Sequence, residues 1–244
     1  MKPIIKILLK KTYLLVFMGA LIHIEAQTND IDNINSLQIW GDITLKTQLT
    51  DNWSTGGDFG LRHSADHPLF WQFYLRPNIN YKLTKRVNFS LGLGSFNTFI
   101  KDLFNTYEFR VYQDTNINWP ELGFFSILHR FRFEQRFFNF SEKSIQNDSR
   151  LRARYLIGVK TGSFKLLGNK ASTAFISLEP FFPLAGSKNN FAVNNFRWDT
   201  AISFQMNENL KLELHYILQT SNIPLLADKS VIENIIRCRA YLNI

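Results

Sequence analysis

The histidines are the residues of this chain best suited to acid–base or metal chemistry, and there are five of them. His63, Asp66 and His67 fall within the segment "HSADH", whose side chains could hold a metal ion from a loop. Spacing of this kind is common in solvated loops, which is the more frequent role of such residues. We therefore predict no metal site and no cofactor.

His215 shares one side of a predicted strand with Lys211 and Glu213, where it could act as a base. A polar position inside a barrel is the commoner role for such a residue. His129 alternates with Phe131 near a strand end, which suits a ring at a membrane interface. No catalytic residue is predicted from these positions.

A ladder of charges is the strongest chemical pattern. In "HRFRFEQRFF" (129–138) the phenylalanines at 131, 133 and 137 occupy one parity, and arginines and a glutamate occupy the other. Long side chains on neighbouring strands can pair, so Glu108 and Arg110 are expected to meet Arg130, Arg132 and Glu134. The predicted ladder consists of Glu108, Arg110, Arg130, Arg132, Glu134, Arg136, Arg150, Arg152, Arg154, Arg197, Lys211 and Glu213.

Two roles are open for this ladder. One is the lining of a pore that attracts anions. The other is a structural packing of paired charges. A barrel of ten to twelve strands is only a little wider than one that its side chains fill, so we favour the structural role.

Composition narrows the class of protein. The 244 residues carry a formal charge of +8, with 15% aromatic residues. Lysine and arginine alternate with apolar residues and form no tract, so no nucleic-acid partner is expected. Cys238 is the single cysteine, which excludes an internal disulfide and a cysteine-based metal cluster.

The first residues have the pattern of a secretory signal peptide. Four lysines at positions 2, 6, 10 and 11 are followed by a short apolar core, Tyr13 to Ile24, and by Ala26 before Gln27. The alternative is a membrane anchor, but the core is shorter than the roughly 20 residues that a span needs. We expect a signal peptide over 1–26, which includes His23, and a mature domain over 27–244.

Most of the mature chain alternates with period two, and no stretch keeps a helical period. The connections are alternately short and long, as in outer-membrane barrels. Eleven segments are predicted as strands: 37–49, 53–63, 70–83, 87–98, 106–118, 123–138, 149–161, 171–179, 193–206, 210–221 and 231–244.

These segments are long for a soluble sandwich. Trp71 and Tyr81 lie ten residues apart on one face, about 33 Å along a strand or about 25 Å of height when tilted. We predict an all-β, antiparallel up-and-down transmembrane β-barrel of about 10–12 strands; a soluble periplasmic β-sandwich is the alternative. Single-chain bacterial barrels have even strand numbers, so eleven implies an extra strand over 28–36 or one divided strand.

Several motifs occur in a family's order: "HRFRFEQRFF", "SRLRARYLIGVKTG", "FISLEPFFPL" and "FRWDTAISFQMNENLKLELHYILQ". In these the chain resembles the domain-of-unknown-function 2490 family of Bacteroidota outer-membrane proteins. "LQIWGDITLKTQLTDNWS" is similar to that family's opening hairpin. The resemblance implies a barrel in the outer membrane, with lipid and the barrel-assembly machinery as partners, and no established activity.

An enzyme remains as an alternative, because the outer-membrane phospholipase is a barrel of similar size with a His-x-Ser-Asn-Gly signature. Here "HYILQTSN" (215–222) has different spacing and no glycine. His215 also falls on the interior parity rather than the lipid-facing one. We therefore expect no enzymatic activity.

Overall fold

A computed structural model describes residues 34–66, 69–101, 104–166, 170–186, 195–222 and 230–244 of the chain. Contacts divide the chain into two units, Met1–Asp32 and Asn33–Ile244. The first unit, which contains the predicted signal peptide, lies outside the described residues. The strands are β1 (Ile34–Gln48), β2 (Trp53–Ser64), β3 (Phe70–Lys82), β4 (Val87–Ile100), β5 (Thr106–Asn118), β6 (Phe125–Phe140), β7 (Asp148–Thr161), β8 (Phe164–Leu166), β9 (Lys170–Ala185), β10 (Asn195–Gln205), β11 (Leu210–Asn222) and β12 (Ser230–Asn243).

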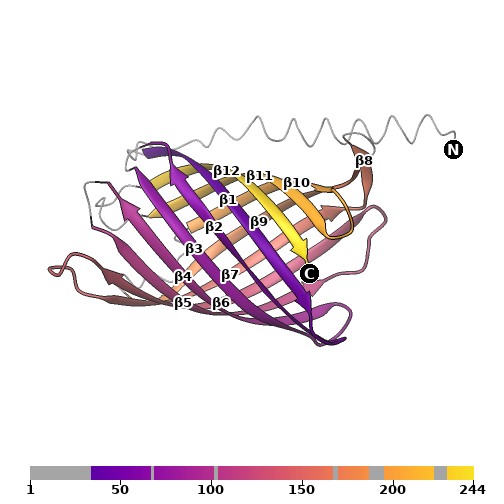
Figure 1. The fold of residues 1–244 in the computed structure, drawn as a ribbon, viewed down its shortest axis with the longest axis horizontal. Helices are drawn as coiled ribbons and strands as arrows, with labels where there is room; N and C mark the ends of the chain where they lie inside the picture. The colour runs from indigo at the N-terminus through magenta and orange to yellow at the C-terminus, as the bar shows by residue number, and fades with distance from the viewer. Residues whose placement is uncertain (1–33, 67–68, 102–103, 167–169, 187–194, 223–229) are drawn as a thin grey trace. The chain divides into compact units, whose positions relative to one another are not determined.

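These strands form one closed barrel, in which β9 pairs with β10 and β12 pairs with β1 (Figure 1). The short β8 pairs with the beginning of β9, next to the stretch that pairs with β7. It therefore prolongs β7 after a break at residues 162–163. When β7 and β8 are counted as one strand, the barrel has eleven strands, and the predicted all-β barrel of 10–12 strands is confirmed. In the described part of the chain no helix has the length and hydropathy of a membrane span.

The closing pair is the one place where the barrel departs from the predicted antiparallel arrangement. β1 and β12 run parallel, from Ile34 opposite Val231 to Lys46 opposite Asn243. When the number of up-and-down strands is odd, the first and last strands run in the same direction where they meet. The barrel is therefore mixed, and the described strands close it as eleven. Of the segment 28–36 considered for an extra strand, residues 34–36 belong to β1 and the rest lies outside the described residues.

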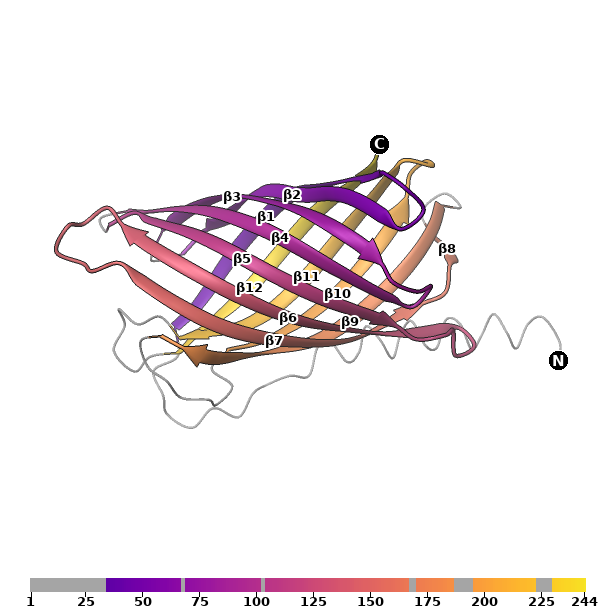
Figure 2. The ribbon, with the colours of Figure 1, turned by 90° about the horizontal axis from the view of Figure 1, so that it is seen from below.

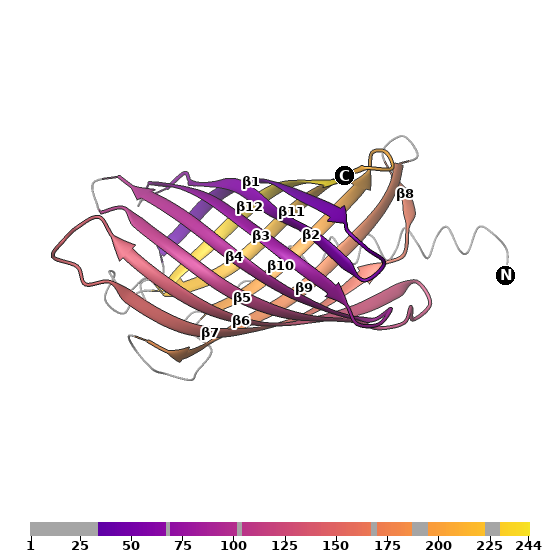
Figure 3. The same ribbon diagram turned by 60° about the horizontal axis from the view of Figure 1, so that its bottom comes forward.

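The connections at one rim of the barrel are mostly shorter than those at the other, although the β5–β6 connection at 119–124 is longer than 65–69 and 101–105 at the opposite rim. Figures 2 and 3 show the strands running obliquely between these rims. β1 begins at the rim of longer loops, whereas the chain ends at the other rim, where the Ile244 N–H donates to Lys46 O at 2.9 Å. We call them the short-turn rim, which includes residues 49–52, 83–86, 119–124 and 206–209, and the long-loop rim, which includes the described residues 65–66, 69, 101, 104–105, 141–147 and 186.

The short turns are held by their own polar side chains. Asn207 Oδ1 accepts hydrogen bonds from the backbone N–H groups of Asn209 and Leu210, at 3.0 and 2.8 Å. Thr84 Oγ1 does the same for Arg86 and Val87. Asn and Thr favour tight turns because such bonds replace a ladder bond that the turn cannot make.

The two faces of the strands have opposite character. On β3, Trp71, Phe73 and Leu75 are 54%, 42% and 49% exposed, whereas Tyr74 between them is 1% exposed. The same alternation places large apolar side chains outward on the other long strands and buries polar ones. The interior of the barrel therefore contains the charges, and the outside contains the apolar rings.

Candidate functional site

All twelve residues of the predicted ladder form ion pairs. The neighbours differ in part from those expected. Glu108 meets Arg136 on β6, because the antiparallel register places Arg110 opposite Arg136 and moves Arg130 and Arg132 toward the other rim. Arg132 instead pairs with Asp114 at 2.6 Å.

Glu108 is held by two arginines at once. Arg110 donates to it through Nε and Nη2 at 2.5 and 2.8 Å, and Arg136 does so at 2.5 and 3.1 Å. The carboxylate is 6% exposed. Two forked contacts satisfy its lone pairs, which a buried carboxylate needs in order to stay ionised.

Glu134 lies at the centre of a second cluster and is 1% exposed. Arg152 Nε and Arg154 Nη1 donate to it at 2.7 and 3.1 Å. Arg154 also donates through Nη2 to Glu179 at 2.7 Å, which links β6, β7 and β9. Sequence reasoning missed Glu179, although it is the one charge between the apolar residues of "FISLEPFF".

A third cluster joins the first and last strands. Arg237 donates to Asp42 through Nε and Nη2 at 2.5 and 3.0 Å, and Arg239 pairs with the same carboxylate. Arg239 also lies 3.8 Å from Asp58. None of these four was in the predicted ladder. The available signal was an isolated charge at the interior parity of an apolar strand.

Aromatic rings on the interior parity stack with arginines across the barrel. The guanidinium of Arg62 lies 4.0 Å from the centre of the Trp40 ring, 4.6 Å from that of Tyr74 and 5.7 Å from that of Phe96. On the opposite side Arg197 lies 5.6 Å from Trp40 and 5.5 Å from Phe181. We call Trp40, Arg62, Tyr74, Phe96, Phe181 and Arg197 the cross-barrel layer.

The cross-barrel layer is densely packed. Trp40, Tyr74, Phe96 and Phe181 are 4%, 1%, 0% and 2% exposed. Cation–π contacts of this kind are worth about 0.5–2 kcal/mol each. The layer joins side chains of β4, β3, β2, β1, β10 and β9, and its contact between Trp40 and Arg197 links two strands that β11 and β12 separate.

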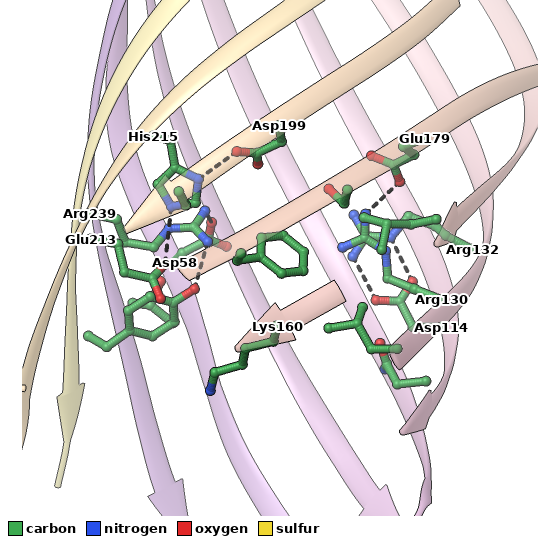
Figure 4. Close-up of a pocket in the computed structure, with 18 of the residues that line it drawn as sticks. Asp58, Asp114, Arg130, Arg132, Lys160, Glu179, Asp199, Glu213, His215 and Arg239 are labelled. Carbon is green, nitrogen blue, oxygen red and sulfur yellow. Dashed lines mark hydrogen bonds and ion pairs between the residues drawn. The ribbon is translucent and has the colours of Figure 1, made fainter. Parts of the chain in front are cut away.

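A cavity of about 440 Å³ occupies the interior toward the short-turn rim. We call it the short-turn cavity. Its lining includes Asn116 and Leu128, which flank one short turn, and Ser203 and Lys211, which flank another. Figure 4 shows its ion pairs on the walls and the Lys160 side chain pointing away from them. A second cavity of about 290 Å³ lies beside β1 to β5 at the same rim.

Three histidines, His63, His129 and His215, lie in the part of the chain that the structure describes. His215 has a carboxylate at each ring nitrogen, Asp199 at 2.8 Å from Nδ1 and Glu213 at 3.1 Å from Nε2. His129 Nδ1 shares a hydrogen bond with the Tyr155 hydroxyl at 2.7 Å, and the His63 ring stacks on Trp71.

The predicted loop residue Asp66 accepts a hydrogen bond from the Leu37 N–H at 2.8 Å. Its neighbour His67 lies outside the described residues. Among those described, no three His, Cys, Asp or Glu side chains are placed to hold a metal ion.

The sequence profile of the family described as "Protein of unknown function (DUF2490)" matches residues 37–224. No curated protein matches the chain.

Proposed function

The chain belongs to the DUF2490 family, and we propose that it is an outer-membrane β-barrel with a sealed interior, a structural or interaction barrel rather than an open pore. One observation carries this proposal: apolar side chains cover the outside of the barrel, and buried ion pairs line the inside. A water-soluble barrel has the opposite arrangement, because its core is apolar and its surface is hydrated.

The outer surface supports contact with lipid. Ile39 and Leu61 are 54% and 51% exposed in the middle of their strands. Trp53 and Trp119 lie exposed at the short-turn rim, and Trp71 lies exposed near the long-loop rim. Aromatic girdles at both interfaces, with an apolar band between them, are the pattern of transmembrane barrels. A closed barrel also satisfies the backbone hydrogen bonds that lipid cannot.

The location is tested by fractionation of cells that make the full chain. The protein is expected in the outer-membrane fraction, to resist a carbonate wash and to need detergent for extraction. Folded barrel protein should migrate faster on an unheated gel than after boiling. Recovery as a soluble periplasmic protein would overturn the membrane proposal in favour of the soluble sandwich class.

The cross-barrel layer supports a sealed interior, because its buried rings and guanidinium groups pack against one another inside the barrel. In planar lipid bilayers the wild-type protein is expected to show no steady conductance. Replacing Trp40 and Phe181 together by alanine removes two rings from the layer and should open a small conducting path. The matched control is Trp71→Ala, which removes an outward ring and should leave the bilayer insulated.

A steady wild-type conductance that the double variant does not change would contradict the sealed interior. It would favour the narrow pore with a charged lining. The ladder would then act on passing anions rather than on the packing of the barrel.

The proposal includes no hydrolytic activity. Both ring nitrogens of His215 are occupied by carboxylates, so neither is poised beside a serine hydroxyl as a base. Purified protein incubated with phospholipid should release no more fatty acid than a blank. Turnover that His215→Ala abolishes would instead support the lipid-acting enzyme.

Any recognition of partners, in this proposal, falls to the long-loop rim, in the loops predicted near 139–148, 180–192 and 222–230. Assembly would depend on outer-membrane lipid and on the barrel-assembly machinery. The strand β12 closes the barrel against β1 and ends at Asn243.

A further inference from the structure

We infer that the short-turn cavity is a blind pocket for a small soluble polyanion, a molecule carrying phosphate or carboxylate groups, that enters from the short-turn rim. The inference goes beyond the proposed function, which assigns the interior only a packing role. Only the identity of the compartment that the pocket faces rests on the membrane proposal.

The charge of the cavity wall favours an anion. Nine lysine and arginine side chains line the short-turn cavity, against five aspartates and glutamates. The excess is confined within a protein wall, where charges are screened less than at an open surface. A volume of about 440 Å³ is within the usual range for small-molecule pockets.

Lys160 is the residue most directly available to a ligand. Its side chain lines the short-turn cavity and forms no ion pair with any residue that the structure describes. The like charge of Lys211 and the opposite charge of Glu213 both act on its ammonium group. The two lysines come from β7 and β11, on either side of β9 and β10, and an anion between them would relieve their repulsion.

Other cations of the cavity are only partly occupied. Arg130 gives Nη2 to Glu179 at 2.5 Å and remains 24% exposed. Lys211 pairs with Glu213 at 2.9 Å and lies 3.9 Å from the centre of the Tyr241 ring. A guanidinium has five N–H donors and an ammonium three, so each retains donors for an incoming anion.

Neutral polar side chains of β3 and β4 contribute another part of the wall. Asn78, Asn80 and Ser90 line both the short-turn cavity and the smaller cavity beside it. Asn80 Nδ2 donates to Asn78 Oδ1 at 2.7 Å, and Ser90 Oγ donates to Asn80 Oδ1 at 2.6 Å. Amide and hydroxyl groups of this kind suit the uncharged, hydroxylated part of a ligand.

The pocket is blind because the cross-barrel layer forms its inner end. Arg197 belongs to both: it lines the short-turn cavity and stacks near Trp40 and Phe181. A solute that enters from the short-turn rim therefore meets arginines that lie against packed rings: Arg154 lies 4.4 Å from the centre of the Phe181 ring, and Arg76 lies 5.0 Å from that of Tyr74. This distinguishes a binding pocket from the lining of a pore.

The test is a titration of the mature protein, folded in a zwitterionic detergent at low ionic strength, with inorganic pyrophosphate followed by calorimetry. Saturable binding is expected. Lys160→Gln should weaken the affinity at least about tenfold, as loss of a charge-assisted contact does. The matched control is Lys85→Gln, an exposed lysine in a turn of the same rim that lies outside the cavity lining. Its affinity should equal that of the wild type.

A second measurement does not depend on the folding of a variant. Acetylation of lysines in the wild-type protein, read by mass spectrometry, should be slowed at Lys160 by pyrophosphate and unchanged at Lys85. The inference is overturned by absence of saturable binding up to millimolar pyrophosphate, by equal affinities of Lys160→Gln and wild type, or by an equal loss in both variants. The last result would indicate attraction to the general surface charge.

Discussion

The parallel closing pair places the single cysteine of the chain opposite a glycine, which allows a direct test of the closure. Cys238 on β12 is the register partner of Gly41 on β1. Cys238 is exposed on the outer face, and a Cβ added at Gly41 would have no atom within 4 Å. We predict that Gly41→Cys forms a disulfide with Cys238 under mild oxidation.

The geometry and the size of the effect follow from this register. Neighbouring strands lie about 4.8 Å apart, and a disulfide needs Cα atoms about 4.4–6.8 Å apart. The bond would close a loop of roughly 200 residues, which in the chain-entropy model stabilises the folded state by about 5 kcal/mol as an upper limit. The same bond would covalently link β1 and β12, the paired strands that lie farthest apart in the sequence.

The assay is a non-reducing gel of the oxidised, purified protein, together with a count of free thiols by mass spectrometry. In lipid vesicles the oxidised variant should unfold at a higher urea concentration than its reduced form. Ile39→Cys is the matched control: it also faces outward on β1, but it lies about 6.6 Å farther along the strand from the partner of Cys238. Its thiol should remain free.

Two results would refute the closure as described. A cross-link in Ile39→Cys but not in Gly41→Cys would mean that β1 is shifted by two residues against β12. Two free thiols in both folded variants would mean that these strands do not pair in parallel at all.

Three further predictions test the two faces of the strands, the pairing of β1 with β12, and the export of the protein. Ile157, 39% exposed on β7, should face lipid, so Ile157→Arg should lower the free energy of unfolding in vesicles by about 2–4 kcal/mol, whereas Ile157→Leu should not. Equal band shifts of the two variants on unheated gels would contradict this assignment. Asp42→Asn leaves Arg237 and Arg239 without their shared carboxylate and should cost about 3–5 kcal/mol in urea unfolding; an unchanged midpoint would contradict it. Amino-terminal sequencing of the mature protein from cells should begin at or near Gln27, and an intact Met1 would sink the signal-peptide prediction.

The strands were accessible from the sequence because each residue's environment alternates with period two. The segment predicted at 70–83 is β3, Phe70–Lys82, and the one at 106–118 is β5 with the same bounds. β9 shows where alternation fails. It was predicted to end at 179 but continues to Ala185 through "PFFPL", where consecutive apolar residues and two prolines hide the two faces. A register shift against β7 at Leu151 and Arg152 accompanies this irregular end.

The arrangement of the interior could be predicted only in part from the sequence. Parity identified which charges share a face, and all twelve do form ion pairs. It did not identify their partners, because pairing depends on the stagger between strands and on contacts across the barrel. Trp40 and Phe181 illustrate this limit: they come from β1 and β9, and both stack near Arg197 of β10. A tryptophan on the interior parity has no local signal that distinguishes it from one facing lipid.

The two ends of the barrel interior differ, because the short-turn cavity lies at one end and the cross-barrel layer separates it from the other. The odd number of strands also places the start of β1 and the end of β12 at opposite rims. β1 begins at the long-loop rim and β12 ends at the short-turn rim. In outer-membrane barrels the short turns face the periplasm. Under the proposed location the cavity would open to the periplasm, and the layer would separate it from the cell exterior. An anion bound there would come from the periplasmic side and return to it. The packed layer and the pocket are then compatible within one barrel, because a binding site that is closed at its inner end does not breach the permeability barrier.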